Sequence, residues 1–267
     1  MPLISLGIPD LMLAASLLLV NGAISLALAL RLERPLAVAA VRMVVQLAIV
    51  GLVLERIFAL GSPWLTLGVA LAMALFAGQE IMARQERRLA GPWTYGLGTA
   101  PMVFAATLVL ILALSTAVRP DPWWDPRYAI PMLGMILGNA MSGVSLALNA
   151  LTVAAWRERA AVEARLALGA GRWEAMRTLH RQALRTGLMP IINAMAATGL
   201  VSLPGMMTGQ ILAGVAPAEA VRYQILIMFL IAGATGLAVL AATLAAVARL
   251  TDSRHRLRLD RLAPPRG

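Results

Sequence analysis

The stretch RERAAVEARLALGAGRWEAMRTLHRQALRTG, residues 157–187, decides how this chain is organised, together with SLPGMMTGQ, residues 202–210. The first stretch is basic and polar and separates two long apolar segments. The second interrupts the later of these segments at the depth where a membrane helix would run. A membrane anchor needs neither feature. A basic connector followed by a broken apolar helix is typical of a transport protein that a separate motor drives.

The composition places the whole chain in a membrane. Of its 267 residues, 60% are hydrophobic and 13% are charged, and the mean hydropathy is +0.79. Spanning a bilayer takes about 20 apolar residues, and the backbone in lipid must satisfy its own hydrogen bonds, which favours helices. We therefore expect an all-α polytopic protein, a single transmembrane domain over residues 1–267 with about seven transmembrane helices. The expected spans are roughly 9–30, 36–54, 64–82, 97–118, 128–150, 187–213 and 223–248.

Several sequence features that the chain lacks narrow its chemistry. It has no cysteine, which excludes disulfides, thiolate metal sites and cysteine nucleophiles. It has no G-x-x-x-x-G-K-[ST] pattern and no lysine to complete one, so it cannot bind ATP in the usual way. We expect no catalytic residue and no cofactor in this chain, and an energy source in a partner or an ion gradient. The first apolar segment lacks a basic n-region and a cleavage site, so we interpret it as a retained helix.

The charge distribution predicts the orientation. The formal net charge is +10, and all 23 basic residues are arginine. Most lie in alternate loops, and short arginine-rich loops stay cytoplasmic, so we expect the N-terminus outside, the C-terminus inside, and no nucleic-acid partner. The rich loops hold Arg31 and Arg34, Arg84 to Arg88, Arg157 to Arg185, and Arg249 to Arg266, whereas the other loops hold only Arg56, Arg119, Arg127 and Arg222 among acidic residues.

The segment 157–187 predicts two short helices. Gly169-Ala170-Gly171 breaks the helical pattern and favours an elbow. Such a pair can lie on anionic lipid, dock into an acidic groove of a partner, or form a solvated loop. Its second helix has an apolar stripe on one face and an arginine stripe on another. The apolar stripe is Met176, Leu179 and Ala183, and the arginine stripe is Arg177, Arg181 and Arg185.

The segment 202–210 predicts a broken helix. A proline at position 204 removes a backbone donor and clashes with the carbonyl of Leu200, and Gly205 adds freedom. Broken helices at membrane depth mark transport paths or hinges, although a static kink is the alternative. The residues that we assign to a translocation path here are Pro204, Met206, Met207, Thr208 and Gln210.

Other polar residues within the spans have two interpretations each. Arg42, with Gln46 one turn later, either faces a cavity or extends to the cytoplasmic interface. Asn139 and Asn193 either line the same path or hold helices together. Methionines near the break either bind a soft metal such as Cu(I) or fill gaps in the packing, so the metal ligands stay unknown.

Two peripheral segments and the small residues complete the pattern. The external loop RPDPWWDPRY, residues 119–128, is an interfacial collar or a lid. The basic tail, residues 249–267, lies on membrane lipid or is a frayed end. Small residues such as Gly143 and Ala147 allow helices to pack closely.

The connector resembles the coupling segment of ABC-transporter membrane subunits, whose loop runs E-A-A-x-x-x-G. Glu163, Ala164 and Gly169 stand at matching positions, Trp173 and Glu174 follow, and Arg165 replaces the second alanine. The resemblance implies that these residues couple the chain to an ATPase.

The run GLVSLPGMMTGQILAG, residues 199–214, resembles the FetB-like iron-export permease family, which includes plant proteins linked to aluminium tolerance. The resemblance covers nearly the whole chain, with Arg42 and Gln46 matching its N-terminal half. It implies a permease of the bacterial inner membrane that exports iron or another metal. It also implies a permease homodimer with two ATP-binding subunits that bind ATP-Mg.

Two other functions stay open at this point. An ion-coupled carrier is one, although it would usually show inverted repeats and buried ionisable residues. A membrane-embedded enzyme is the other, with Glu80, Arg84 and Glu86 as the nearest charged cluster. The sequence leaves the true substrate, a metal, a chelate or a nucleotide sugar, and the direction of transport open.

Overall fold

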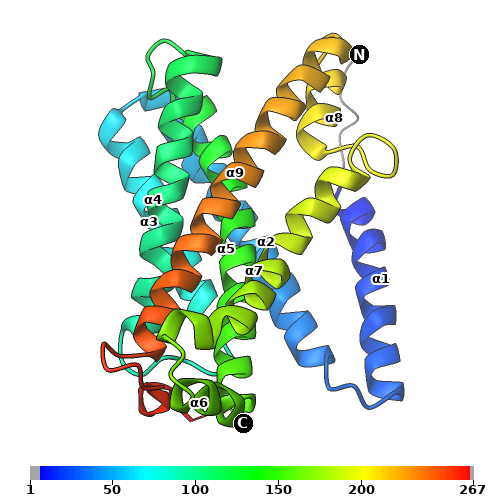
Figure 1. The fold of residues 1–267 in the computed structure, drawn as a ribbon. Coiled ribbons are helices and arrows are strands. Elements are labelled where there is room, and N and C mark those ends of the chain that lie inside the picture. The colour runs from blue at the N-terminus through cyan, green and yellow to red at the C-terminus, as the bar shows by residue number, and fades with distance from the viewer. Residues whose placement is uncertain (1–6, 265–267) are drawn as a thin grey trace. The chain divides into compact units, whose positions relative to one another are not determined.

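The computed structural model describes residues 7–264 and divides the chain into two compact units (Figure 1). The first unit is Met1–Gly61 with Leu212–Gly214, and the second is Ser62–Ile211 with Val215–Gly267. Helices make up both, and residues 7–264 contain no β-strand, only isolated bridges. The all-α class is therefore confirmed.

The first unit contains the hairpin of α1 (Ile8–Ala27) and α2 (Glu33–Leu60). The hydroxyl of Ser25 organises the turn: it donates to the Glu33 carboxylate at 2.9 Å and accepts the Leu32 amide at 2.9 Å. Nearly all apolar side chains of both helices are exposed within the structure. Such a surface is stable in lipid or against other protein, not in water.

The second unit contains most of the chain. Its helices are α3 (Pro63–Ala83), α4 (Trp93–Leu112) with the π-helix η1 (Ala113–Val118), α5 (Pro126–Arg157), α6 (Arg159–Ala167), α7 (Arg172–Ala197), α8 (Gly205–Leu212), α9 (Pro217–Leu250) and the short 3-10 helix η2 (Leu259–Arg261).

Six helices among the described residues are long and apolar enough to cross a membrane: α1, α2, α3, α4 with η1, α5 and α9. The protein is therefore polytopic, as expected. The span expected at 187–213 is not one helix. It consists of the end of α7, a break over residues 198–204, and α8.

Residue 187, the expected boundary between a short connector helix and a membrane span, is not a helix boundary. α7 runs without interruption from Arg172 to Ala197, so the second helix of the connector is long, not short, and continues into the membrane segment. The reason is that Gly187 serves packing and does not end the helix. Pro190 likewise lies inside α7.

The core of the second unit lies where α5, α7 and α9 pack together. A Cβ on Gly187 would lie 2.7 Å from the Ala147 Cβ and 2.7 Å from the Gly143 carbonyl oxygen. A Cβ on Gly143 would lie 2.9 Å from the Gly187 carbonyl oxygen and from a methyl group of Thr235. The small residues at 143 and 147 thus let α5 and α7 approach closely within one chain.

Gly187→Ala should destabilise the protein because the new methyl group overlaps backbone and side chain of α5. Overpacking of this kind costs about 1–3 kcal/mol. Gly236→Ala on α9 is the matched control, because a Cβ there meets nothing within 4 Å. Thermal unfolding in detergent should give a lower Tm for the first variant only. Equal Tm values for both would contradict the packing described here.

Candidate functional site

The connector forms the predicted helical pair, α6 and α7, joined by an elbow at residues 168–171. The amide of Leu168 donates to the carbonyl of Ala164 at 3.0 Å, and the Gly169 amide donates to Leu166 at 3.0 Å. Gly169 has φ +93°, a left-handed conformation that side chains rarely adopt. Glycine at this position therefore ends α6 and turns the chain into α7.

The inner face of the pair holds it against the rest of the unit. The predicted apolar stripe of α7 is fully buried, with Val162 of α6 beside it. Arg165, which stands where the ABC motif has alanine, donates from Nη1 to the carbonyl of Ala175 at 3.1 Å and so ties α6 to α7. The departure from the motif therefore has a structural role in this chain.

The outer face carries the residues that the motif marked for coupling. All five are exposed: Glu163, Ala164, Gly169, Trp173 and Glu174. Leu168, at the tip of the elbow, is 88% exposed. Sequence reasoning did not select Leu168, although an apolar residue directly before the turn glycine was the available signal. Together these residues form an exposed apolar tip flanked by charge, which we call the coupling surface.

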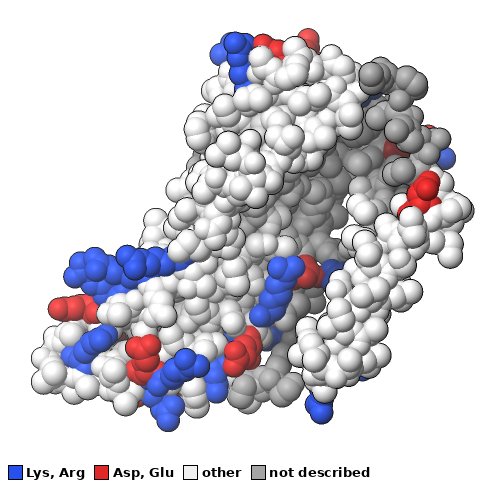
Figure 2. Space-filling view, turned by 90° about the vertical axis from the view of Figure 1, so that its right-hand side faces the viewer, with Lys and Arg blue, Asp and Glu red and all other residues white. Residues whose placement is uncertain are grey.

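Residues 249–264 of the C-terminal tail are folded against the same end of the unit, not frayed. The Ala90 amide donates to Arg261 at 2.7 Å, and the Ala263 amide donates to Arg88 at 2.7 Å. The guanidinium of Arg249 lies over the ring of Trp93, 4.2 Å from its centroid. In Figures 1 and 2 the α6 end of the unit lies beside the C-terminus and carries most of the visible arginines.

The tail also reaches the elbow. The Arg172 amide, in the first turn of α7, donates to Nδ1 of His255 at 3.0 Å. This amide is one of the helix-terminal donors that have no partner within the helix. His255 thus caps α7 beside the coupling surface, and Asp252 shapes the turn that presents it. Asp252 accepts from the amides of Arg254 and Arg256 at 3.0 and 2.9 Å.

These hydrogen bonds perturb the two carboxylates of the tail. The backbone amide of Arg256, with its guanidinium, holds the pKa of Asp252 below its usual value. The bidentate guanidinium of Arg258, at 2.8 and 2.9 Å, lowers the pKa of Asp260 to about 2. Both carboxylates are therefore ionised in the folded tail at neutral pH.

The break follows α7 at residues 198–204. Gly199 has φ +94°, its amide donates to Ser202 at 2.9 Å, and the carbonyl of Ala197 accepts from Val201 and Ser202. The predicted mechanism, a kink in which Pro204 clashes with the carbonyl of Leu200, is wrong. Leu200 is already outside any helix and 95% exposed, and Pro204 instead directly precedes α8, where its carbonyl accepts the Thr208 amide.

A cavity of about 520 Å³ lies beside the break. It is partly open and is bordered by the end of α7, the loop, α8 and the first turns of α9, and all of its lining residues belong to the second unit. Its walls are Met195, Thr198, Gly199, Leu203, Pro204, Met207, Val221, Gln224, Ile225, Met228 and Phe229.

Only some predicted path residues line this cavity. Pro204 and Met207 do, whereas Met206, Thr208 and Gln210 lie on α8 outside its walls. Sequence reasoning did not select Gln224 as a path residue, although a single amide inside an otherwise apolar span was a usable signal. It also left Met195 and Met228 out of the path.

The other predicted path residues lie elsewhere. Asn139 is exposed on α5, where its amide donates to the Met135 carbonyl at 2.8 Å. Asn193 is exposed on α7 and lines a shallow open depression along that helix. Arg42 and Gln46 are exposed on α2, in the first unit. Within residues 7–264 no group of three or more His, Cys, Asp or Glu residues is placed to hold a metal ion.

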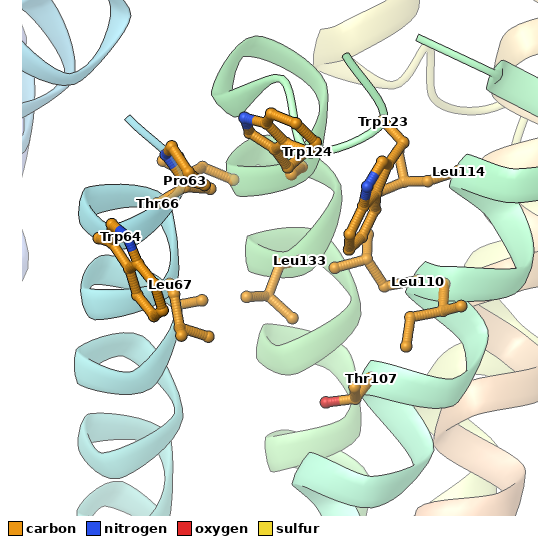
Figure 3. Close-up of a pocket in the computed structure, with 14 residues that line it drawn as sticks. Pro63, Trp64, Thr66, Leu67, Thr107, Leu110, Leu114, Trp123, Trp124 and Leu133 are labelled. Carbon is orange, nitrogen blue, oxygen red and sulfur yellow. The ribbon is translucent and has the colours of Figure 1, made fainter. Parts of the chain in front are cut away.

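The loop of residues 119–128 borders a second cavity, of about 450 Å³, between α3, α4 with η1, and α5 (Figure 3). Trp123 and Trp124 meet edge to face with their ring centroids 5.8 Å apart, and Trp64 faces them from α3. Asp125 caps α5 by accepting the Arg127 amide at 2.9 Å. This apolar, tryptophan-rich rim fits an interfacial collar.

Fold and composition together define a multi-pass α-helical membrane protein. The chain belongs to the family described as "Uncharacterised protein family (UPF0014)", which matches residues 8–251. It is 33% identical over 253 residues to the probable iron export permease protein FetB of Escherichia coli, covering 95% of each chain.

Two further relatives belong to different kinds of organism. A UPF0014 membrane protein of Synechocystis is 38% identical over 217 residues, which cover 80% of this chain and 82% of the relative. The protein ALUMINUM SENSITIVE 3 of Arabidopsis thaliana is 32% identical over 215 residues, 80% and 76% of the two chains. No solved structure matches this chain.

Acid or an Asp252→Asn substitution should loosen the tail. Because the pKa of Asp252 is lower in the folded state than its usual value of about 3.9, its contribution to stability is complete above that value and is lost as the pH falls through the folded pKa. Hydrogen exchange of the 249–264 segment, corrected for intrinsic rates, should therefore speed up from about pH 5 to about pH 3.

At pH 7 the Asp252→Asn variant should show the same loss of protection. Asp121→Asn, in the loop of residues 119–128, is the matched control and should leave the tail unchanged. Undiminished protection of the tail in the Asp252 variant would show that this carboxylate does not organise it.

Proposed function

We propose that this protein is the membrane permease subunit of an ABC transporter, driven by a separate ATP-binding subunit that docks on the coupling surface. The observation that carries the proposal is the exposed elbow around Leu168 and Trp173, on the arginine-rich side of a membrane bundle. Two further facts support it: the chain contains no P-loop, and the E. coli relative is named as a permease. ATP and Mg²⁺ would be bound by the partner.

α7 offers a direct route from the docking surface to the membrane path. It is one helix of 26 residues, about 39 Å long, with the elbow at its start and the break at its end. A packed helix moves as a rigid body, so a displacement of the elbow by the ATPase is delivered to the cavity beside the break. We infer that this cavity is part of the translocation path.

A metal is the proposed cargo, and export the proposed direction, because the E. coli relative carries the name of an iron export permease. We further propose that two copies of the chain assemble in a bacterial inner membrane. The exposed polar side chains Asn139 of α5 and Asn193 of α7 support this, since amides at membrane depth favour protein or water over lipid.

Orientation follows from the arginine pattern: N-terminus outside, elbow and C-terminus in the cytoplasm. Because the chain has no cysteine, single cysteines report it directly. In intact spheroplasts, a membrane-impermeant maleimide should label Trp123→Cys. The same reagent should label Leu168→Cys only after the membrane is opened. Labelling of position 168 from outside would place the elbow beyond the reach of any ATPase and exclude the proposed function.

Trp173→Ala should abolish association with the ATP-binding subunit, because it removes the largest apolar side chain of the coupling surface. Interface tryptophans commonly contribute about 2 kcal/mol or more. The measurement is recovery of a P-loop protein with the tagged permease from native membranes, identified by mass spectrometry. Trp123→Ala, an exposed tryptophan of the external loop, is the control and should retain it. Full recovery with the Trp173 variant would count against this docking site.

A further inference from the structure

We propose that the cavity beside the break binds a soft monovalent cation of the Cu(I) class. Its ligands would be the thioethers of Met195, Met207 and Met228 and the side-chain oxygen of Gln224. The inference rests on the proposed function in taking the break as part of the path. It goes further by naming the class of metal that this path can hold.

The three methionines come from three different elements. Met195 lies near the end of α7, Met207 on α8 and Met228 on α9, and all three line one cavity. No lining residue is ionisable, and the remaining walls are mostly apolar. The cavity therefore offers neutral, polarisable sulfur donors and almost nothing else.

Gln224 gives an independent observation that points to a ligand. Its side chain is 7% exposed and lines the cavity, and its Oε1 atom is buried without a hydrogen-bond partner among the described residues. A buried amide oxygen without a partner is costly, and native proteins seldom leave one so. The oxygen itself is covered in this structure, so a rotation of the side-chain amide would bring it to a cation in the cavity and give it the partner that it lacks.

The donor set selects a soft cation over a hard one. Thioethers suit Cu(I), whereas iron ions and other harder cations favour carboxylate, imidazole and water oxygen or nitrogen. A hard cation would enter this cavity without any charged ligand to offset the loss of its hydration. Three thioethers and one carbonyl oxygen supply enough donors for a singly charged soft ion.

Packing alone does not account for these methionines. Methionine used as a gap-filler occupies irregular space, but here about 520 Å³ stays open beside the three side chains. Met206, the neighbour of Met207, packs against the core and does not line the cavity, whereas Met228 packs against the core and also lines the cavity.

The test is binding of Ag(I), a redox-inert stand-in for Cu(I), to the purified full-length protein by calorimetry. Cu(I) competition against a chromogenic chelator under reducing conditions gives a second measurement. The expected result is one saturable site per chain. Met207→Leu combined with Met228→Leu, and Gln224→Leu alone, should each weaken binding by about tenfold or more. Met206→Leu is the matched control and should bind as the wild type does.

The outcomes separate this proposal from the one on which it rests. Unchanged Ag(I) affinity in the Met207/Met228 double variant, at an unchanged Tm, would overturn it. So would tighter binding of Fe(II) than of Ag(I), or a lipid retained in the cavity that Ag(I) does not displace. Recovery of the ATP-binding subunit with a permease that binds no Ag(I) would refute the cation site and leave the permease function standing. A permease that binds Ag(I) when purified, but with which no ATP-binding subunit is recovered from native membranes, would refute the permease function and leave the cation site standing.

Discussion

The close contact of α7 with α5 and α9 at Gly187 is the interaction on which the rest of the second unit depends. α7 begins at the exposed elbow and ends at the break, and at Gly187, near its middle, it lies at backbone distance from α5. At that distance no side chain fits between the two backbones. A helix held in this way moves as a rigid body about the contact at Gly187. A displacement of one end therefore moves the other end, although the two ends do not touch.

The break satisfies most of the hydrogen-bond demands that lipid imposes. Three residues, Ala197, Gly199 and Ser202, close the turn through their own backbone groups. Leu200 and Val201 are left pointing away from it, and both are apolar. A loop that satisfies its backbone internally and presents aliphatic side chains outward can lie at membrane depth, where an ordinary polar loop cannot. This explains how the chain can interrupt a span and still keep an apolar surface.

The sequence predicted those parts of the fold that local chemistry determines. Gly169 marked the elbow, the 176–179–183 stripe marked the buried face, and the proline–glycine pair at 204–205 marked an interruption. It did not predict the continuity of α7, because the contact that makes Gly187 a packing residue comes from α5, far away in the chain. For the same reason Met195, Met207 and Met228 could not be recognised as one group before the fold brought α7, α8 and α9 together. The sequence did not predict the fold of the tail either, because the tail pairs with residues 88–90 through backbone groups that carry no sequence signal.

The exclusive use of arginine has a physical reason beyond orientation. Lysine would satisfy the positive-inside rule equally well, but it cannot stack as a plane or donate in a fork. At the α6 end the guanidinium of Arg87 lies 4.2 Å from the ring centroid of Trp156, and that of Arg261 donates to the carbonyl of Arg249. Arg165 binds the two connector helices in the same way. The arginines at this end of the unit thus also bind its elements to one another through stacking and hydrogen bonds, which lysine could not do in the same way.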